Sequence, residues 1–426
     1  MLGVLPVILR RSSILGKFAS LEMLNKAVMF LTGILVVRHL AKTDYAWYTI
    51  TNSMIGGMGM LTALGVSIGL MSMGGERFGD RAAMGRLMTT CYRYRTIFAG
   101  IFGPIVIGAM AFMLSRNGSP AGLTLVLMVL VVIYMVIQIN QDMAQTLLRL
   151  AGRYNHPQVV GVGVAIVRLA TLGLLVVFAL LEVWTALVVT VGLQAVGYLC
   201  FIRPQAQHYY SKQEPLDPEA GAKIRKITYN TLPETLKSFF MPQLGVFLIA
   251  TFGNTENVAD LGALGRLAMI FSIPAAFNGA IFQPWLARSS REKLLRNYLQ
   301  LLATAAIISA TVFATCWIGR FHLIDLLGDA YQGLEGELVL LAGSSSIALF
   351  MSTSGIILAA KGWVRHLWVQ PLATTLVTIG CIPLVNFSDL SEVILLGYAR
   401  FIVLAIILPI LIFKGFLSHA NSQHHQ

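Results

Sequence analysis

The sequence predicts an all-α polytopic membrane protein with about 12 transmembrane helices in two pseudo-symmetric six-helix bundles. Three observations lead to this fold class: the composition, the succession of apolar segments, and a layout that recurs in both halves. Of the 426 residues, 56% are apolar and only 12% are charged, whereas a soluble domain carries about 25% charged residues. Such a composition excludes a water-soluble globule, and its apolar content excludes a disordered chain.

Apolar segments long enough to cross a bilayer follow one another along the whole chain. A spanning helix needs roughly 20 mainly apolar residues. We expect twelve spans, at 18–38, 45–73, 96–115, 122–148, 157–181, 184–202, 230–252, 259–286, 298–319, 334–360, 364–386 and 391–413.

Lys and Arg residues concentrate in alternate connections between these segments. With a cytoplasmic N-terminus, 22 of the 31 basic residues fall in cytoplasmic regions and four in outer connections. Basic connections stay on the cytoplasmic side of a membrane, so we expect both termini in the cytoplasm. The same distribution argues against a nucleic-acid partner, despite the net charge of +12.

The longest hydrophilic stretch, 203–226, follows the sixth span and divides the chain. We expect it to link an N-terminal six-helix lobe, 1–213, to a C-terminal six-helix lobe, 214–426. The spans of one half map onto those of the other with an offset of about 200–215 residues. Six spans per half give parallel repeats, which is a recurring plan among transporters.

Charged residues recur in the first helix of each half. A charge at the centre of a bilayer costs about 2.5–3.5 kcal/mol, so it must face protein or water. Glu22 and Lys26 are spaced i, i+4, and Glu234 and Lys237 are spaced i, i+3, so each acid can pair with its base. Such a pair either aids insertion or lines a cavity, and the spacing permits both.

Arg168 lies at the centre of the fifth span without an acid within reach on its own helix. An arginine keeps its charge in proteins, so it needs a partner from a ligand or from another helix. Asp142 is the candidate structural partner, because Gln138, Asp142, Gln145 and Arg149 share one face of the fourth span. That face lines either a neighbouring polar helix or a water-filled cavity.

Arg266 and Arg400 lie inside the eighth and twelfth spans, where each could pair locally or join the cations of a cavity. Walker A, HExxH, paired CxxC and EF-hand patterns are lacking, so we expect no metal and no cofactor. No predicted outer connection is long enough to form a catalytic domain. Transport is therefore favoured over catalysis, and the protein is not expected to be an enzyme.

Two stretches of the N-terminal half resemble Wzx-type polysaccharide flippases. Arg38-His39-Leu40, a short polar turn and Tyr45-Ala-Trp-Tyr48 are similar to that family's opening Arg-x-Leu and Tyr/Phe-Gly-x-Tyr, with Ala46 in place of the glycine. Leu15–Phe18 and Phe30-Leu31 belong to the same opening. Leu147–Arg153 resembles the family's Leu-Arg-Ala-x-Gly-Lys/Arg segment. The layout of twelve spans extends the resemblance over nearly the whole chain.

This resemblance implies membership of the superfamily of multidrug, oligosaccharidyl-lipid and polysaccharide (MOP) exporters, whose two helical bundles form a V around a central cavity. It implies flipping of undecaprenyl-pyrophosphate-linked oligosaccharides to the outer leaflet of the bacterial inner membrane, for cell-surface polysaccharides such as O-antigen. Lys26, Arg168, Lys237, Arg266 and Arg400 would then be cavity cations for pyrophosphate or acidic sugars. Glu22, Asp142 and Glu234 would be candidate ion carriers, and Gln138 and Gln145 polar lining.

Other functions remain open at this stage. Peptidoglycan-precursor flippases are similar but generally carry two further spans. A cation-coupled small-molecule exporter of the same superfamily also fits twelve spans, although a basic cavity suits anionic lipids better than cationic drugs. A membrane enzyme of glycan assembly ranks third. Polymerase or other assembly proteins are possible partners of a flippase.

Overall fold

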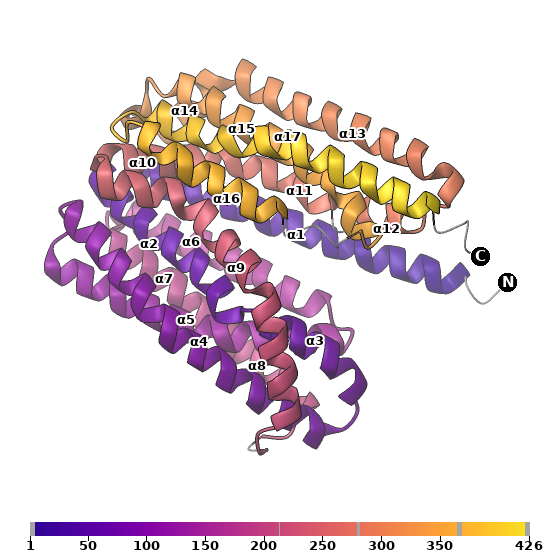
Figure 1. Ribbon diagram of the computed structural model, residues 1–426. Helices are drawn as coiled ribbons and strands as arrows, with labels where there is room; N and C mark the ends of the chain where they lie inside the picture. Colours follow the sequence, from indigo (N-terminus) through magenta and orange to yellow (C-terminus); the bar gives the residue numbers. More distant parts are fainter. Residues whose placement is uncertain (1–4, 213, 279–281, 364–368, 422–426) are drawn as a thin grey trace. The chain divides into compact units, whose positions relative to one another are not determined.

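Helices make up the regular structure of the described residues, as Figure 1 shows. The computed structural model describes residues 5–212, 214–278, 282–363 and 369–421. Within these ranges there is no β-strand, so the all-α class predicted from the composition is confirmed.

The chain forms two compact units, 1–259 and 260–426. The first unit is built around α1 (Leu5–His39), α2 (Lys42–Ala63), α3 (Val66–Arg77), α4 (Arg81–Arg116), α5 (Ala121–Leu150), α6 (Asn155–Val177), α7 (Val183–Val196), the π-helix η1 (Gly197–Ile202), α8 (Arg203–Ala206) and α9 (Pro218–Phe252). A short 3₁₀ turn, η2 (Gln207–Tyr209), follows α8. The predicted boundary between sequence repeats, 213/214, precedes α9 and stays a prediction.

The second unit begins within α10 (Thr255–Ala268). It continues through η3 (Met269–Phe271), α11 (Ser272–Phe277), α12 (Gln283–Ala287), α13 (Arg291–Ile318), α14 (Arg320–Leu327), η5 (Asp329–Tyr331), α15 (Glu335–Ala360), α16 (Val369–Cys381), η6 (Ile382–Leu384) and α17 (Leu390–Asn421). Buried apolar side chains of α12, α13, α15 and α17 form its core, among them Leu286, Leu294, Ile357 and Leu408.

Ten described helices are long and apolar enough to cross a membrane, and α2 with α3 makes an eleventh if that bent pair is one span. This number agrees with a polytopic membrane protein. The predicted span at 364–386 corresponds to a shorter apolar helix, Val369–Leu384, and residues 364–368 lie outside the described ranges. The predicted orientation of the termini stays a prediction.

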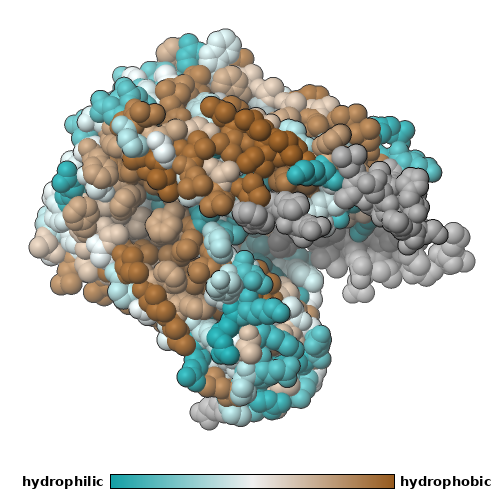
Figure 2. All heavy atoms as spheres, viewed as in Figure 1, coloured by the Kyte–Doolittle hydropathy of each residue, from teal (hydrophilic) through white to brown (hydrophobic). Residues whose placement is uncertain are grey.

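Hydrophobic side chains cover wide areas of the surface seen in Figure 2. Exposed hydrophobic residues of the first unit include Ile105 on α4 and Leu125 on α5, each more than half exposed. Water would penalise such exposure, whereas lipid tails are as apolar as these side chains. The surface therefore suits a bilayer.

A break after α2 divides the predicted second span into α2 and α3, which meet at 45°. Leu64 and Gly65 occupy the break with positive φ angles of 27° and 77°. Gly65 is needed there, because a Cβ atom would also lie 2.7 Å from Thr231 Oγ1 on α9. The carbonyl of Leu64 accepts a hydrogen bond of 2.8 Å from Thr228 Oγ1. A side chain of α9 thus supplies the donor that the break in the helix removes.

The start of α4 lies well before the predicted span at 96–115. Asp80 caps this helix by accepting hydrogen bonds from the main-chain nitrogens of Ala82 and Ala83, at 2.9 and 3.0 Å. The helix therefore begins at Arg81 and carries Arg95 into the interior, where that side chain is 0% exposed. Arg95 thus lies within a helix and not in a connection between the predicted spans.

Arg95 joins three helices of the first unit. Its Nε donates to the carbonyl of Thr62 on α2 at 3.3 Å, and its Nη1 to that of Ile139 on α5 at 3.1 Å. Its Nη2 forms an ion pair with Asp142 Oδ2 at 3.1 Å. Gln138 Nε2 donates to the other carboxylate oxygen at 2.9 Å. The buried charge thus meets a counter-charge and two carbonyls.

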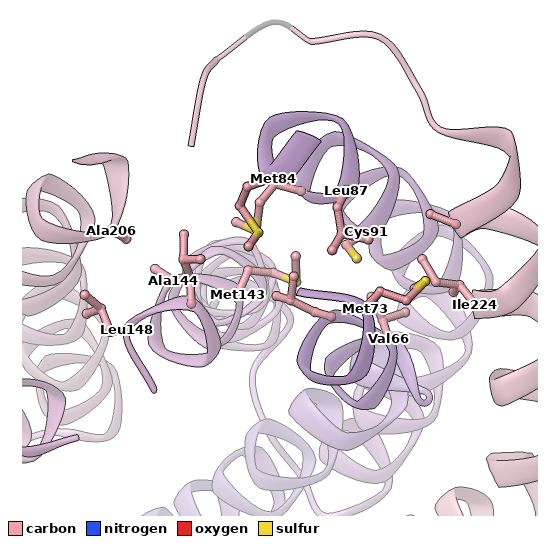
Figure 3. Close-up of a cluster of buried hydrophobic side chains, with 14 of the residues drawn as sticks. Val66, Met73, Met84, Leu87, Cys91, Met143, Ala144, Leu148, Ala206 and Ile224 are labelled. Atoms are coloured by element: carbon pink, nitrogen blue, oxygen red, sulfur yellow. The ribbon is translucent and has the colours of Figure 1, made fainter. Parts of the chain in front are cut away.

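A hydrophobic cluster adjoins this ion pair (Figure 3). Cys91 belongs to it and precedes Arg95 by one helical turn, and Met143 belongs to it and follows Asp142. The labelled side chains come from α3, α4, α5, α8 and α9. Apolar neighbours lower the local dielectric constant, which strengthens the electrostatic attraction of a nearby ion pair.

Near both ends of α9, hydrogen bonds connect this helix to other parts of the first unit. Asp217 caps its start, forms an ion pair with Arg77 at 2.6 Å, and donates its main-chain nitrogen to Thr90 Oγ1 at 2.9 Å. The hydrogen bond from Ala220 and the nearby Arg77 hold the pKa of Asp217 below its ordinary value. Toward the other end, Asn117 Nδ2 donates to the carbonyl of Ala250 at 2.8 Å.

Replacing Arg95 by methionine should lower the free energy of unfolding by about 1–3 kcal/mol, because the half-buried Asp142 would lose its cation and the carbonyls of Thr62 and Ile139 would lose their donor. Denaturant titration of the purified protein in detergent measures this loss. Arg95→Met combined with Asp142→Asn should recover part of it. Arg93→Met, at an exposed position of the same helix, is the control. Equal stability of the Arg93 and Arg95 variants would contradict the assignment.

Thr228→Val should destabilise the protein by about 1–3 kcal/mol, because the Leu64 carbonyl would lose its hydroxyl donor. Thr228→Ser keeps the hydroxyl and should stay close to the wild type. Thermal unfolding in one detergent compares the variants. Identical midpoints for the valine and serine variants would show that this hydrogen bond does not support the bend.

Candidate functional site

A polar cavity of about 290 Å³ lies inside the first unit. Side chains of α1, α5, α6, α7 and η1 surround it. Its polar lining comprises Asn25, Tyr134, Gln138, Gln141, Gln145, Gln158, Arg168, Gln194 and Tyr198. Six of these nine side chains are amides, which can both donate and accept hydrogen bonds.

Three of the amides are placed by the helical period of α5. Gln138, Gln141 and Gln145 follow at spacings of three and four, so they share one face. Gln141 is held from across the cavity, because Gln194 Nε2 on α7 donates to its Oε1 at 2.7 Å. Gln138 and Gln145 of the predicted polar face thus line the cavity. Asp142 on the same face forms its ion pair with Arg95 instead.

Close packing forms the wall between α6 and η1. A Cβ atom on Gly197 would lie 2.6 Å from Val164 Cγ2, so this position of η1 needs a glycine. The π-helix that begins there brings Tyr198 and Ile202 to the cavity lining. Extra-wide turns of this kind are frequent at functional sites.

Arg168 is the cation of this cavity. It is half-buried, and its Nε is buried without a hydrogen-bond partner. The alternative pair with Asp142 does not form, because that carboxylate bonds to Arg95 and Gln138. No carboxylate lines the cavity within the described ranges. The positive charge of Arg168 is therefore available to a ligand.

Gln138 adds an unsatisfied acceptor to the same cavity. Its Nε2 is used by Asp142, and its buried Oε1 has no partner. An orphaned buried donor and an orphaned buried acceptor are each costly unless a further molecule bonds them. A ligand with both hydroxyl groups and a negative charge would satisfy the two side chains.

The remaining predicted site residues lie outside this cavity. Glu234 and Lys237 form the predicted pair on α9, with 2.9 Å between Oε1 and Nζ. Glu22 and Lys26 are half-buried on α1, flanking the cavity residue Asn25 in sequence. Whether any of these four contacts a substrate stays a prediction.

Arg266 and Arg400 belong to the second unit, on α10 and α17. The Arg400 guanidinium lies 4.8 Å from the ring centroid of Phe401, and its Nε is buried without a hydrogen bond. A shared cavity that unites these cations with Arg168 stays a prediction.

Several residues of this region were missed by reasoning from the sequence. Tyr134 lines the cavity but was not among the candidate site residues. Gln141, Gln158 and Gln194 were not singled out, although glutamines inside apolar spans are a visible signal. Asp80 could have indicated that Arg95 lies inside α4, because aspartate favours the N-cap position. Among the described residues, no group of three His, Cys, Asp or Glu could hold a metal ion.

No protein-family model matches the chain, and no curated protein matches it. Solved structures do resemble it. An inward-facing multidrug resistance MATE family transporter of the MOP superfamily has a TM-score of 0.63 at 16% identity, over 91% of this chain and 95% of that one. The lipid II flippase MurJ, in an inward closed conformation, has a TM-score of 0.68 at 11% identity, over 93% and 87%.

A MOP superfamily transporter from Pyrococcus furiosus, described as having a binding pocket of reverse polarity, has a TM-score of 0.60 at 15% identity. That alignment covers 92% of this chain and 93% of the other. Likeness over such lengths at such low identity establishes architecture and not substrate. The chain therefore has the all-helical fold of MOP superfamily transporters.

Proposed function

We propose that this protein is a membrane flippase that moves polyprenyl-pyrophosphate-linked oligosaccharide units from the cytoplasmic to the outer leaflet of a bacterial inner membrane. The observation that carries the proposal is the amide-rich cavity around Arg168 inside a MOP-type fold. Amide side chains match the paired donors and acceptors of sugar hydroxyls. An arginine without a carboxylate partner suits an anionic sugar or a pyrophosphate.

The size of the cavity supports binding of a polar head and not of a whole lipid. Its volume of about 290 Å³ lies near the lower end of small-molecule sites. The polyprenyl tail would remain in the bilayer, where it meets the exposed apolar side chains. Rocking of two helical bundles is the mechanism that this fold favours for exposing such a head to each side in turn.

A cation-coupled exporter of small molecules is the second candidate, because MATE family transporters share the fold. The polarity of the cavity weighs against cationic drugs: Arg168 contributes a positive charge, and no carboxylate lines the described cavity. Glu22, Asp142 and Glu234 remain the proposed ion carriers. Protonation of Asp142 would weaken its ion pair with Arg95 on α4. Ion coupling through Asp142 would therefore change how α4 is held against α5.

Arg168→Ala should reduce glycan export about tenfold or more while leaving the protein inserted, because a charged hydrogen bond is worth about 1.5–3 kcal/mol. Arg168→Lys should retain part of the activity, since it keeps the charge but loses the planar fork. Lys26→Ala should also reduce export. Surface glycan in a strain that depends on the variant gives the readout, with membrane immunoblots for insertion.

Arg93→Ala is the matched control for these variants, since it removes one exposed cation from α4. Normal export by the Arg168→Ala protein would remove the cavity assignment, and normal export when Lys26→Ala is added would also remove the predicted role of Lys26 beside the cavity. The flippase proposal itself would survive either result.

Depletion of the protein should accumulate completed polyprenyl-pyrophosphate-linked units on the cytoplasmic face. Mass spectrometry identifies the lipid, and an impermeant glycosidase or lectin on intact spheroplasts reports its side. Units that reach the outer face unpolymerised would instead indicate an assembly enzyme or partner. An unchanged glycan pool would contradict the flippase proposal and favour the small-molecule exporter.

A further inference from the structure

A second cavity of the first unit has a different chemistry from the one around Arg168. It has a volume of about 390 Å³ and lies between α4, α5, η1 and the segment 203–212. Its lining comprises Tyr92, Val136, Ile137, Asn140, Tyr198, Leu199, Arg203, Gln207, Tyr210 and Lys212. The two cavities share Tyr198.

Two cations, Arg203 and Lys212, line this cavity. Arg203 and Lys212 are exposed lining residues, and neither forms an ion pair within the described part of the chain. Their nearest acidic neighbour in sequence, Glu214, lies 4.0 Å from Arg86. No carboxylate lines the described cavity. Two like charges at one site favour an anionic ligand.

Three phenol groups line the same cavity as the cations. Tyr92, Tyr198 and Tyr210 line the cavity, and their hydroxyl groups have no hydrogen-bond partner among the described residues. Burial raises the pKa of Tyr210, against an opposing effect of the Arg203 charge. Its hydroxyl group therefore stays protonated at neutral pH and can donate to an oxyanion.

Apolar side chains also line the cavity, and one of them, Leu199, precedes Arg203 by about one helical turn. Val136 on α5 is 52% exposed, and Leu199 on η1 is 48% exposed. Both belong to helices that are long and apolar enough to span a membrane. An occupant that fits both kinds of lining has a negatively charged head and a hydrocarbon tail.

The segment that carries both cations is held in place by the rest of the unit. The main-chain nitrogen of Ser211 donates to the carbonyl of Arg81 at 2.8 Å. Gly85 leaves room for this approach, because a Cβ atom there would overlap the Ser211 carbonyl oxygen. The segment between Arg203 and Lys212 is thus packed against α4. This packing fixes the backbone that carries both cations.

We propose that this cavity binds the phosphate head group of an acidic membrane phospholipid. Arg203 and Lys212 neutralise the phosphate, the tyrosine hydroxyls donate to its oxygens, and the acyl chains lie along Val136 and Leu199. Basic pockets beside spanning helices recognise phospholipid head groups in this way. Free phosphate shares the head-group chemistry, but it would leave the apolar side chains without a contact.

Native mass spectrometry of the full-length protein in detergent tests the proposal, with phosphatidylglycerol as the probe and phosphatidylcholine as the neutral comparison. Phosphatidylglycerol should bind more tightly. Arg203→Gln with Lys212→Gln should weaken its binding about 25-fold, or about fivefold for each cation. The control pair Arg93→Gln with Lys226→Gln removes two exposed cations elsewhere and should leave the affinity within about twofold.

Arg203→Lys with Lys212→Arg preserves both charges and should keep most of the binding, which separates lost recognition from lost folding. Inorganic phosphate in millimolar excess should displace little of the lipid. Equal binding of the two lipids, or equal weakening by the two glutamine pairs, would overturn the proposal. Full displacement by inorganic phosphate would also overturn it and would indicate a site for the free anion.

Discussion

The ion pair of Arg95 and Asp142 is the constraint on which the first unit depends. A guanidinium with no exposed surface must form its hydrogen bonds within the protein. The guanidinium of Arg95 forms them with both α2 and α5. Thr62 lies in the last turn of α2, where carbonyls lack helical partners. The charge therefore supports both the end of a broken helix and the position of its neighbour.

This pairing also decides which groups the cavity around Arg168 offers to a ligand. Asp142 shares a helix face with Gln138 and Gln145, yet its carboxylate bonds to Arg95. Among the described residues, no acid then remains for Arg168, and Gln138 keeps an unsatisfied oxygen. A structural ion pair at one edge of the cavity thus leaves a net positive, hydrogen-bonding surface at the other, which fits anionic, hydroxyl-rich heads.

Two cavities of the same unit differ in the chemistry of their linings. One is amide-rich with a single cation, and the other combines two cations with apolar side chains. They meet at Tyr198 on the π-helix η1, whose close approach to α6 depends on Gly197. A change in this short element would alter both cavities, so η1 links the proposed substrate cavity to the proposed lipid site.

The sequence by itself determined the fold class, because spans and their spacing follow from apolar run length and need no tertiary information. It also identified the helix faces, since Gln138 and Gln145 follow the helical period, and the pair Glu234–Lys237 is local. Only the tertiary structure decided the partner of Asp142, because the choice between Arg95 and Arg168 depends on which neighbouring helix approaches α5. It likewise joined Arg203 and Lys212 to tyrosines of α4 and η1. Sequence separation carries no information about such contacts, because packing between helices sets them.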